Sequence, residues 1–237
     1  MKIDFHSHIL PDMDDGPETV DEALKMLRIL KKDGVDIVLA TPHLYFHRDS
    51  VSTFLERREA RAKILFEAIE KKNAETGEEF PRIIIGAEVY FTPALINMPL
   101  RELCIENTDY MLLELPYSHF TSSFMNSFAN FMNVCEVNVI LAHIERYYEY
   151  IHSDCVDEIV AYGLTAQGNC DSLLSVKSRA RALKMIKENK IQLLGTDLHN
   201  LRYRPPNFKD AENLISKKLS RETFDNLMRN AKEILNI

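Results

Sequence analysis

The sequence predicts an α/β protein whose parallel sheet closes, or nearly closes, into a barrel. Short apolar runs alternate with helical segments along the chain, which is typical of parallel strands joined by crossover helices. Seven strands are predicted without a glycine-rich phosphate loop, and this favours a barrel over a dinucleotide-binding fold. Because no repeat, low-complexity tract or linker interrupts the 237 residues, we expect a single domain over residues 1–237.

The predicted strands are short apolar runs bounded by polar or turn residues. They cover residues 2–5, 36–41, 82–87, 110–113, 137–142, 164–167 and 191–195. A first helix follows the capping box of Thr19 and Glu22 and stops at Gly34. A second follows a similar box at Thr53 and stops at Gly77. Further helices are predicted over residues 122–132, 173–188 and 221–235.

The composition excludes several classes of protein. A hydrophobic content of 46% is enough for a full core, and no apolar run is long enough to cross a membrane. The net charge is −7 without a block of Lys or Arg, so nucleic-acid binding is not expected. There is no signal-peptide pattern, and the four cysteines lack CxxC or zinc-ribbon spacing. We therefore expect reduced thiols and a cytoplasmic protein.

Histidines and carboxylates follow six of the seven predicted strands. In chain order these residues are His6 and His8, His43, Glu88, Glu114, His143, and Asp197 with His199. Five of the eight histidines thus lie at strand ends. His6 and His8 alone would fit two surface histidines near a terminus as well as a pair of metal ligands. The recurrence favours a metal site instead, because the carboxyl ends of parallel barrel strands meet at one rim.

The donor set indicates the kind of metal and its number. Imidazoles and carboxylates without a thiolate suit zinc, iron or manganese better than calcium or magnesium. Asp15 brings the number of candidates to nine, enough for two or three ions that share a bridging carboxylate. Clustered ions of this kind activate water and stabilise both oxygens of an in-line phosphoryl displacement.

Competing motifs fit poorly. The stretch of residues 12–16 has its glycine at the fifth position, whereas a calcium loop needs it at the sixth. An aspartyl-phosphate nucleophile would sit at the end of a buried strand, and Pro11 argues against that here. Neither the Cys-x5-Arg pattern of cysteine phosphatases nor a Gly-x-Ser-x-Gly elbow is present.

Arginines near the same strand ends suggest a phosphoryl group. Arg146 lies three residues after His143, and Arg202 and Arg204 lie just after His199. A guanidinium binds phosphate oxygens bidentately, although most arginines are surface partners. Gln167 and Asn169, at the end of the sixth strand, either contact substrate or satisfy backbone groups.

These motifs together resemble a known family. They are His6-Ser-His8, Asp14-Asp15-Gly16-Pro17, Gly86-Ala-Glu88, Ala142-His-Ile-Glu-Arg146, Asp197-Leu-His-Asn200 and Arg204-Pro-Pro206. The pattern is similar to that of tyrosine-protein phosphatases from bacterial capsular and exopolysaccharide loci. Those enzymes belong to the polymerase-and-histidinol-phosphatase (PHP) superfamily.

The resemblance implies a distorted seven-stranded (β/α)7 TIM-like barrel that holds two to three divalent metal ions. These would be manganese or iron, with zinc as an alternative. Its ligand sets correspond to His6, His8, Glu88 and Asp197; to Glu88, Glu114 and His143; and to Asp15, His43 and His199. Arg146 and Arg204 correspond to phosphate-binding arginines, and we add Asn169 as a substrate contact. Family members often carry a basic residue directly after the equivalent of His43. Here Leu44 and Tyr45 follow His43, and the basic residues His47 and Arg48 come later.

The implied reaction is attack on phosphorus by a hydroxide that bridges two metals, with His47 or a metal-bound water as proton donor. The implied substrate is phosphotyrosine on the tail of a bacterial tyrosine kinase. Aromatic residues after the ligand strands would line the rim, or else pack the loops against the barrel: Tyr45, Phe46, Tyr90, Phe91, Tyr117, Phe120, Tyr147 and Tyr148. Two alternatives stay open, a phosphatase of small molecules such as histidinol phosphate and an inactive metal-binding partner module.

Overall fold

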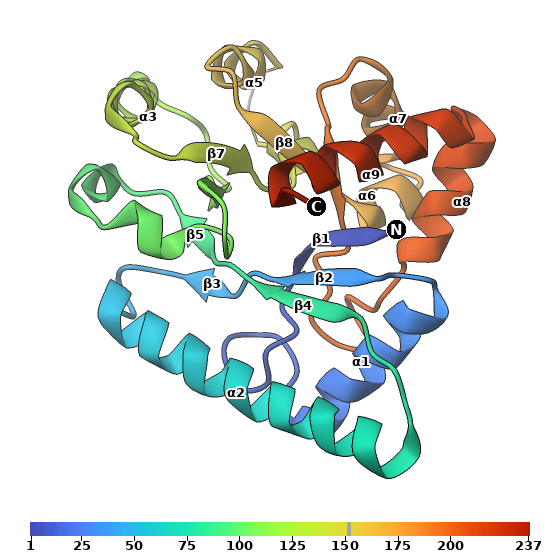
Figure 1. Cartoon of the computed structure of the whole chain (residues 1–237). Helices are drawn as coiled ribbons and strands as arrows, with labels where there is room; N and C mark the ends of the chain where they lie inside the picture. Colours follow the sequence, from blue (N-terminus) through green and yellow to red (C-terminus); the bar gives the residue numbers. More distant parts are fainter. Residues whose placement is uncertain (151–152) are drawn as a thin grey trace.

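The computed structural model describes residues 1–150 and 153–237 and contains two parallel sheets with helices around their outer side (Figure 1). One sheet has the order β1 (Ile3–Ser7), β2 (Ile37–Ala40) and β4 (Arg82–Ile85). The other runs through β3 (His43–Leu44), β5 (Glu88–Tyr90), β6 (Tyr110–Glu114), β7 (Asn138–Leu141), β8 (Thr165–Asn169) and β9 (Leu193–Gly195). All of these pairings are parallel, so the predicted α/β class is confirmed.

Two of the predicted strands end early, and a further short strand follows each of them. Residues 36–41 give β2, and β3 follows after Pro42, which has no N–H to donate. Residues 82–87 give β4, and β5 then begins at Glu88 itself. The expectation that Glu88 follows its strand is therefore wrong, because the ladder breaks earlier, at Gly86. A side chain there would meet Ile105 and Thr41 at 3.3 Å.

The first and last strands lie next to each other. Ser7 and Leu198 form a parallel bridge. The Asp197 amide donates to the His6 carbonyl at 2.8 Å, and the His8 amide donates to the Leu198 carbonyl at 2.9 Å. The parallel strands thus curl so that the segment after β9 reaches the end of β1. This contact brings the first and last predicted ligand pairs together.

The helix boundaries follow local capping. The helix α1 (Val20–Lys32) has Thr19 as its N-cap, as predicted. The helix α2 (Val51–Thr76) has its N-cap at Ser50, three residues before the predicted Thr53, because the Ser50 side chain accepts the Thr53 amide at 3.2 Å. It ends at Gly77, which is in the left-handed conformation. The helices α3 (Ser122–Val134) and α9 (Arg221–Leu235) match their predicted positions.

Other helices differ from the prediction. The single helix expected over residues 173–188 is two, α6 (Cys170–Leu174) and α7 (Arg179–Lys187), and Arg179 donates to the carbonyls of Leu173 and Leu174 at the break. Five short elements were not predicted: the 3-10 helices η1 (Pro93–Asn97) and η2 (Leu100–Leu103) and the helices α4 (Ile144–Tyr147), α5 (Ser153–Val160) and α8 (Phe208–Lys218). No helix among the described residues is long and apolar enough to span a membrane.

A small hydrophobic cluster gathers strand residues such as Ile3, Phe5 and Leu193 with Ala231, Ile234 and Leu235 of α9. The larger cluster joins the helices to the strands. Figure 1 shows α9, in red, crossing near the amino-terminal end of β1. The smaller cluster thus packs α9 against strand residues near the start of β1.

Gly195 lies where β9 approaches β1 closely enough to exclude a side chain, so its substitution tests this contact. A Cβ atom at this position would lie 2.6 Å from the His6 Cβ and 2.9 Å from the His6 amide nitrogen. We expect Gly195→Ala to lower the free energy of unfolding by about 1–3 kcal/mol, measured by chemical denaturation. The control is Gly77→Asn, where nothing lies within 4 Å and Asn tolerates the left-handed backbone. Equal unfolding midpoints for Gly195→Ala and the parent chain would contradict the prediction.

Candidate metal centre

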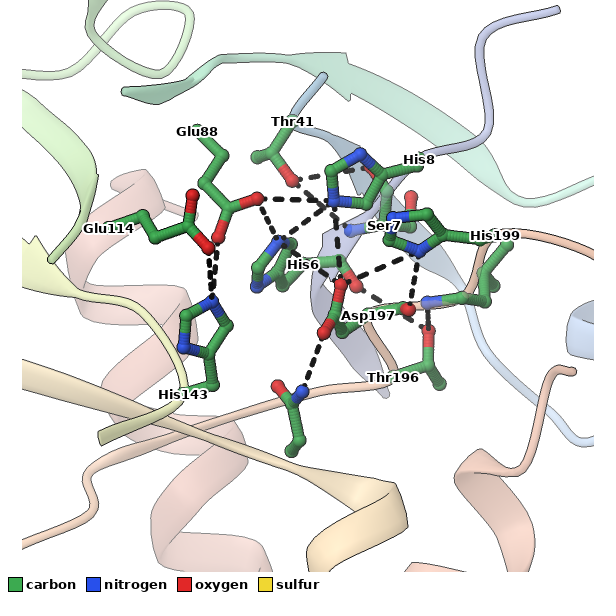
Figure 2. Close-up of polar contacts among 12 residues, drawn as sticks. His6, Ser7, His8, Thr41, Glu88, Glu114, His143, Thr196, Asp197 and His199 are labelled. Atoms are coloured by element: carbon green, nitrogen blue, oxygen red, sulfur yellow. Dashed lines mark hydrogen bonds and ion pairs between the residues drawn. The ribbon is translucent and has the colours of Figure 1, made fainter. Parts of the chain in front are cut away.

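The structure brings the nine predicted ligands together at the carboxyl ends of the strands, and Figure 2 shows seven of them. They are His6 in β1, His8 after it, Asp15 before α1, His43 in β3, Glu88 in β5, Glu114 in β6, His143 after β7, and Asp197 and His199 after β9. Eight of the nine are buried or nearly so. Asp15 is the exception, with a side chain that is 63% exposed.

Glu88 lies in the middle of this cluster. Its Oε2 atom is 2.9 Å from His43 Nδ1 and 3.3 Å from the Nε2 atoms of His6 and His8. Its Oε1 atom is 2.8 Å from His143 Nε2. One buried carboxylate therefore faces four imidazoles, as a bridging ligand would.

Asp197 and Glu114 extend the cluster on two sides. Asp197 Oδ1 lies 3.6 Å from His6 Nε2 and 3.4 Å from His8 Nε2. Glu114 Oε1 lies 3.7 Å from His143 Nε2. The site therefore continues in both directions from Glu88.

A third group lies toward solvent. Asp15 Oδ1 is 3.2 Å from His199 Nε2 and 3.7 Å from His43 Nε2. His8 joins these three residues in one set of donor atoms within 4.8 Å of one another. Two further sets meet the same criterion, His6 with His8 and Glu88, and His43 with Glu88 and Glu114.

Two carboxylate oxygens show that these residues fit divalent cations. Glu88 Oε2 and Asp197 Oδ1 are buried and accept no hydrogen bond from the described residues. Such an oxygen is costly unless a cation or donor compensates it. Donor atoms that bind one ion at about 2.1 Å stand about 3.0–3.4 Å apart, and several of the distances around Glu88 fall there. Imidazoles with carboxylates suit zinc, iron or manganese.

Hydrogen bonds from Nδ1 orient three of the histidines. His6 Nδ1 donates to Gln167 Oε1 at 3.0 Å, and His8 Nδ1 donates to Asp14 Oδ2 at 2.7 Å. These acceptors keep a proton on each Nδ1, so a metal would bind through the Nε2 atoms, which lie 3.2 Å apart. His199 Nδ1 likewise donates to the Asp197 carbonyl at 2.9 Å, and His199 Nε2 accepts from Arg204 Nη1 at 2.7 Å.

The titration of the cluster follows from burial and crowding. Burial, and then the charge of the adjacent Glu88, raises the pKa of Glu114 to about 7. Burial lowers the pKa of His143 to about 4, which keeps this imidazole neutral, the form that binds metals. Burial opposes ionisation of Asp14, but the charge of His8 and its hydrogen bond hold the Asp14 pKa well below its usual range.

Two of these residues adopt a backbone conformation that is uncommon outside glycine. His143 has φ 32° and Asp197 has φ 54°, both in or near the left-handed region. Each lies two residues after the end of its strand and turns its side chain into the cluster. Asp4 supports one of these turns, since its carboxylate accepts from the Thr196 amide at 2.8 Å and from the Thr196 hydroxyl at 2.5 Å. Burial raises the pKa of Asp4 to about 6.

The predicted phosphate arginines reach the cluster from two sides. Arg146 Nη2 lies 2.8 Å from Asp197 Oδ2, and Arg204 Nη2 lies 2.5 Å from the same oxygen. Arg202 is exposed and stacks on Tyr203 at 4.9 Å from the ring centroid. Arg48 is also exposed and lies over the Tyr45 ring, 5.9 Å from its centroid.

Gln167 and Asn169 hold other residues of the site. Gln167 Oε1 accepts the His143 amide at 2.9 Å as well as His6, and Gln167 Nε2 donates to Asn169 Oδ1 at 2.8 Å. Asn169 Nδ2 donates to Asp197 Oδ2 at 2.7 Å. Both polar atoms of the Asn169 side chain are thus engaged within the protein, so the structure gives it a positioning role. The predicted substrate contact of Asn169 stays a prediction.

The aromatic residues divide between the core and the rim. Phe91, Phe120 and Tyr147 are buried, in agreement with the alternative that such residues pack the loops against the strands. Tyr147 Oη accepts the Leu115 amide at 2.8 Å. Tyr45 and Tyr117 face the cluster. Tyr45 Oη lies 3.2 Å from His43 Nδ1, and its ring is tilted by 54° against the Tyr90 ring, with 5.4 Å between the centroids.

Tyr117 Oη lies 3.3 Å from Arg146 Nη1 and 3.2 Å from His143 Nε2. No sequence pattern singles out these contacts.

The supporting roles of Asp14, Asp4 and Glu145 are not predictable from the sequence either, because their partners lie far apart in the sequence or in untypical backbone turns. Asp14 does belong to the motif Asp14-Asp15-Gly16-Pro17, next to the predicted ligand Asp15.

Comparisons with known proteins point to one family. The family model described as "Capsular polysaccharide synthesis, CpsB/CapC" matches residues 2–236. The tyrosine-protein phosphatase CpsB of Streptococcus agalactiae serotype III (strain NEM316) is 29% identical over 247 residues, which cover 98% of each chain. The putative tyrosine-protein phosphatase CapC of Staphylococcus aureus is 28% identical over 239 residues, which cover 98% of this chain and 91% of that protein.

A solved structure has the same fold. It is described as one of YwqE from Bacillus subtilis and CpsB from Streptococcus pneumoniae, called metal-dependent tyrosine phosphatases. The TM-score is 0.84 at 23% sequence identity, over 99% of this chain and 94% of that chain.

Asp14 offers a test of how the supporting hydrogen bonds act on metal retention. Asp14→Asn keeps the shape but removes the negative charge that orients His8. Such supporting partners typically contribute about 10–100-fold in metal affinity, so we expect a loss of that size, measured by competition with a chelator. The control is Asp12→Asn, since Asp12 is 66% exposed and pairs with Arg61. Equal metal retention in both variants would contradict the prediction.

Proposed function

The chain belongs to the CpsB/CapC family of capsular polysaccharide synthesis, as its motifs predicted, and we propose that it hydrolyses phosphotyrosine in a protein substrate with bound divalent metal ions. The observation that supports this most is the convergence of histidines, carboxylates and two arginines at one end of the strands. The relatives named above supply the substrate class, since they are called tyrosine-protein phosphatases.

We propose two to three ions, manganese or iron, with zinc as the alternative. The first would use His6, His8, Glu88 and Asp197; the second Glu88, Glu114 and His143; the third Asp15, His43 and His199. The distances around Glu88 and Asp197 support this division. His8 and His43 each lie close to the donor atoms of two of these sets, which is expected if the ions lie close together.

Each group then has a chemical task. Divalent ions at such a site supply positive charge and lower the pKa of water. Arg146 and Arg204 would hold the non-bridging phosphate oxygens, because both guanidinium groups already face the cluster and are partly exposed. A phenolate leaving group, with a pKa near 10, needs little help from a general acid. If a proton donor acts, it would be a metal-bound water or His47, which is exposed beside Tyr45 with 5.7 Å between the ring centroids.

The finer form of the fold and the partner are also proposals. We infer a distorted seven-stranded barrel closed by the hydrogen bonds between β1 and the segment after β9, in a single domain over residues 1–237. One continuous hydrophobic cluster from Ile9 to Met228 supports the single domain. The proposed substrate is the tail of a bacterial tyrosine kinase that acts in polysaccharide export, which the capsular family supports.

A substrate panel tests the function. The purified protein, loaded in turn with manganese, iron or zinc or stripped by a chelator, is offered a phosphotyrosine peptide, a phosphoserine peptide and histidinol phosphate. We expect the phosphotyrosine peptide to have the highest kcat/KM and the stripped protein to be inactive. A tenfold or greater preference for histidinol phosphate would reject the tyrosine-phosphatase proposal and leave the metal chemistry standing. Full activity after chelation would reject both.

Arginine-to-lysine substitutions test the phosphate contacts. Arg146→Lys and Arg204→Lys keep the positive charge but lose the planar fork, so we expect kcat/KM to fall about tenfold or more while metal content is retained. Metal content is measured by elemental analysis of the same samples. The matched control is Arg202→Lys, since Arg202 stacks on Tyr203. Unchanged kinetics in both test variants would show that Arg146 and Arg204 do not bind phosphate.

A further inference from the structure

A cavity of about 390 Å³ opens directly beside Arg146 and Tyr117. It lies over α4 and α6, and three carboxylates and three serines line it. We propose that this cavity binds an organic cation next to the phosphate, in the proposed substrate a Lys or Arg side chain that flanks the phosphotyrosine. This proposal rests on the function proposed above and adds a sequence preference to it.

Glu145 is the residue in the cavity that points to a ligand. It is 1% exposed, and its Oε1 atom accepts from the Ser172 hydroxyl at 2.6 Å and from the backbone N–H of Asn169 at 3.1 Å. Its Oε2 atom is buried and has no hydrogen-bond partner among the described residues. A carboxylate oxygen without a donor is costly in such a place, and an ammonium or guanidinium group supplies the missing donor.

The charge of the cavity favours a cation as well. Glu149 is exposed and Asp171 is half-buried, so the lining holds three carboxylates and one guanidinium, that of Arg146. Arg146 is already paired with Asp197 at 2.8 Å. The nearby Arg181 donates to the Glu145 carbonyl at 3.3 Å and stacks on Tyr148, so it does not neutralise the Glu145 carboxylate through a hydrogen bond.

Two tyrosines form an aromatic wall suited to the stem of a long basic side chain. Tyr117 and Tyr150 are 37% and 46% exposed, and their ring centroids lie 5.5 Å apart. Lys and Arg pack their methylene stems, and often their charges, against aromatic rings. Because Tyr117 Oη also lies 3.3 Å from Arg146 Nη1, the wall starts at the phosphate arginine. A residue close to phosphotyrosine in a peptide would therefore reach the cavity.

The test uses the full-length, metal-loaded protein and a set of phosphotyrosine peptides. A single Lys is placed in turn at each position from three before to three after the phosphotyrosine, and norleucine at the same position is the uncharged match. We expect Lys to raise kcat/KM about tenfold over norleucine at one or two positions, mainly through a lower KM. Equal efficiencies at every position would overturn the proposal.

Variants locate the effect. Glu149→Gln, at an exposed position, and Glu145→Gln, which keeps the Oε1 acceptor, should each reduce the Lys preference, and Glu149→Lys should turn it toward a Glu-bearing peptide. Glu158→Gln, on the exposed side of α5, should leave the preference as it is. A Lys preference that persists in both Glu145→Gln and Glu149→Gln would place the cation elsewhere and overturn the proposal.

A separate pair of substrates keeps this proposal apart from the tyrosine-phosphatase function. If no phosphotyrosine peptide is hydrolysed, that function fails, and ethanolamine phosphate is compared with ethyl phosphate instead. A preference for ethanolamine phosphate that is lost in Glu145→Gln would still support a cation subsite. Equal turnover of the two esters would overturn it.

Discussion

Glu88 and Asp197 place two fully buried carboxylates within 3.6 Å of the ring nitrogens of His6 and His8. An ionised carboxylate deprived of water needs donors or cations, and the Nδ1 protons of His6 and His8 are already donated to Gln167 and Asp14. Glu88 Oε2 and Asp197 Oδ1 accordingly lack a hydrogen bond within the described chain. This constraint explains much of the site, because a cation placed beside these two oxygens would also face the Nε2 atoms of His6 and His8.

The backbone meets that constraint through departures from regular structure. The ladder of β2 and β4 stops at Pro42 and Gly86 and resumes in β3 and β5, so His43 and Glu88 begin new strand segments and pair with each other in register. His143 and Asp197 take positive φ values two residues after their strands end. Such conformations cost about 1–3 kcal/mol each and persist where surrounding contacts determine them. Here Gln167 and Asp4 supply those contacts, through the His143 amide and Thr196 respectively.

The sequence predicted the parallel α/β class and the convergence of nine side chains, because the placement of residues at strand ends depends only on hydrophobic pattern and on the geometry of parallel sheets. It could not predict which residues support them. Asp14 contacts both His8 and the His43 amide through a turn that no periodicity encodes. Two helix errors have local causes, since Ser50 competes with Thr53 as a cap and Arg179 binds the carbonyls that end α6. Because the strands break at Pro42 and Gly86, Glu88 begins β5 and does not follow the strand predicted over residues 82–87.

Asp197 connects the metal-binding side of the cluster to the side that would hold phosphate. Its Oδ1 atom faces His6 and His8, while its Oδ2 atom accepts from Asn169 and pairs with both Arg146 and Arg204. Two guanidinium groups on one carboxylate oxygen are more than that oxygen needs. Each guanidinium also has N–H groups beyond the one that contacts Asp197, and Arg146 and Arg204 remain 30% and 27% exposed. A phosphate dianion would use these remaining donors, so one carboxylate orients both arginines before substrate arrives and reduces the ordering that binding requires.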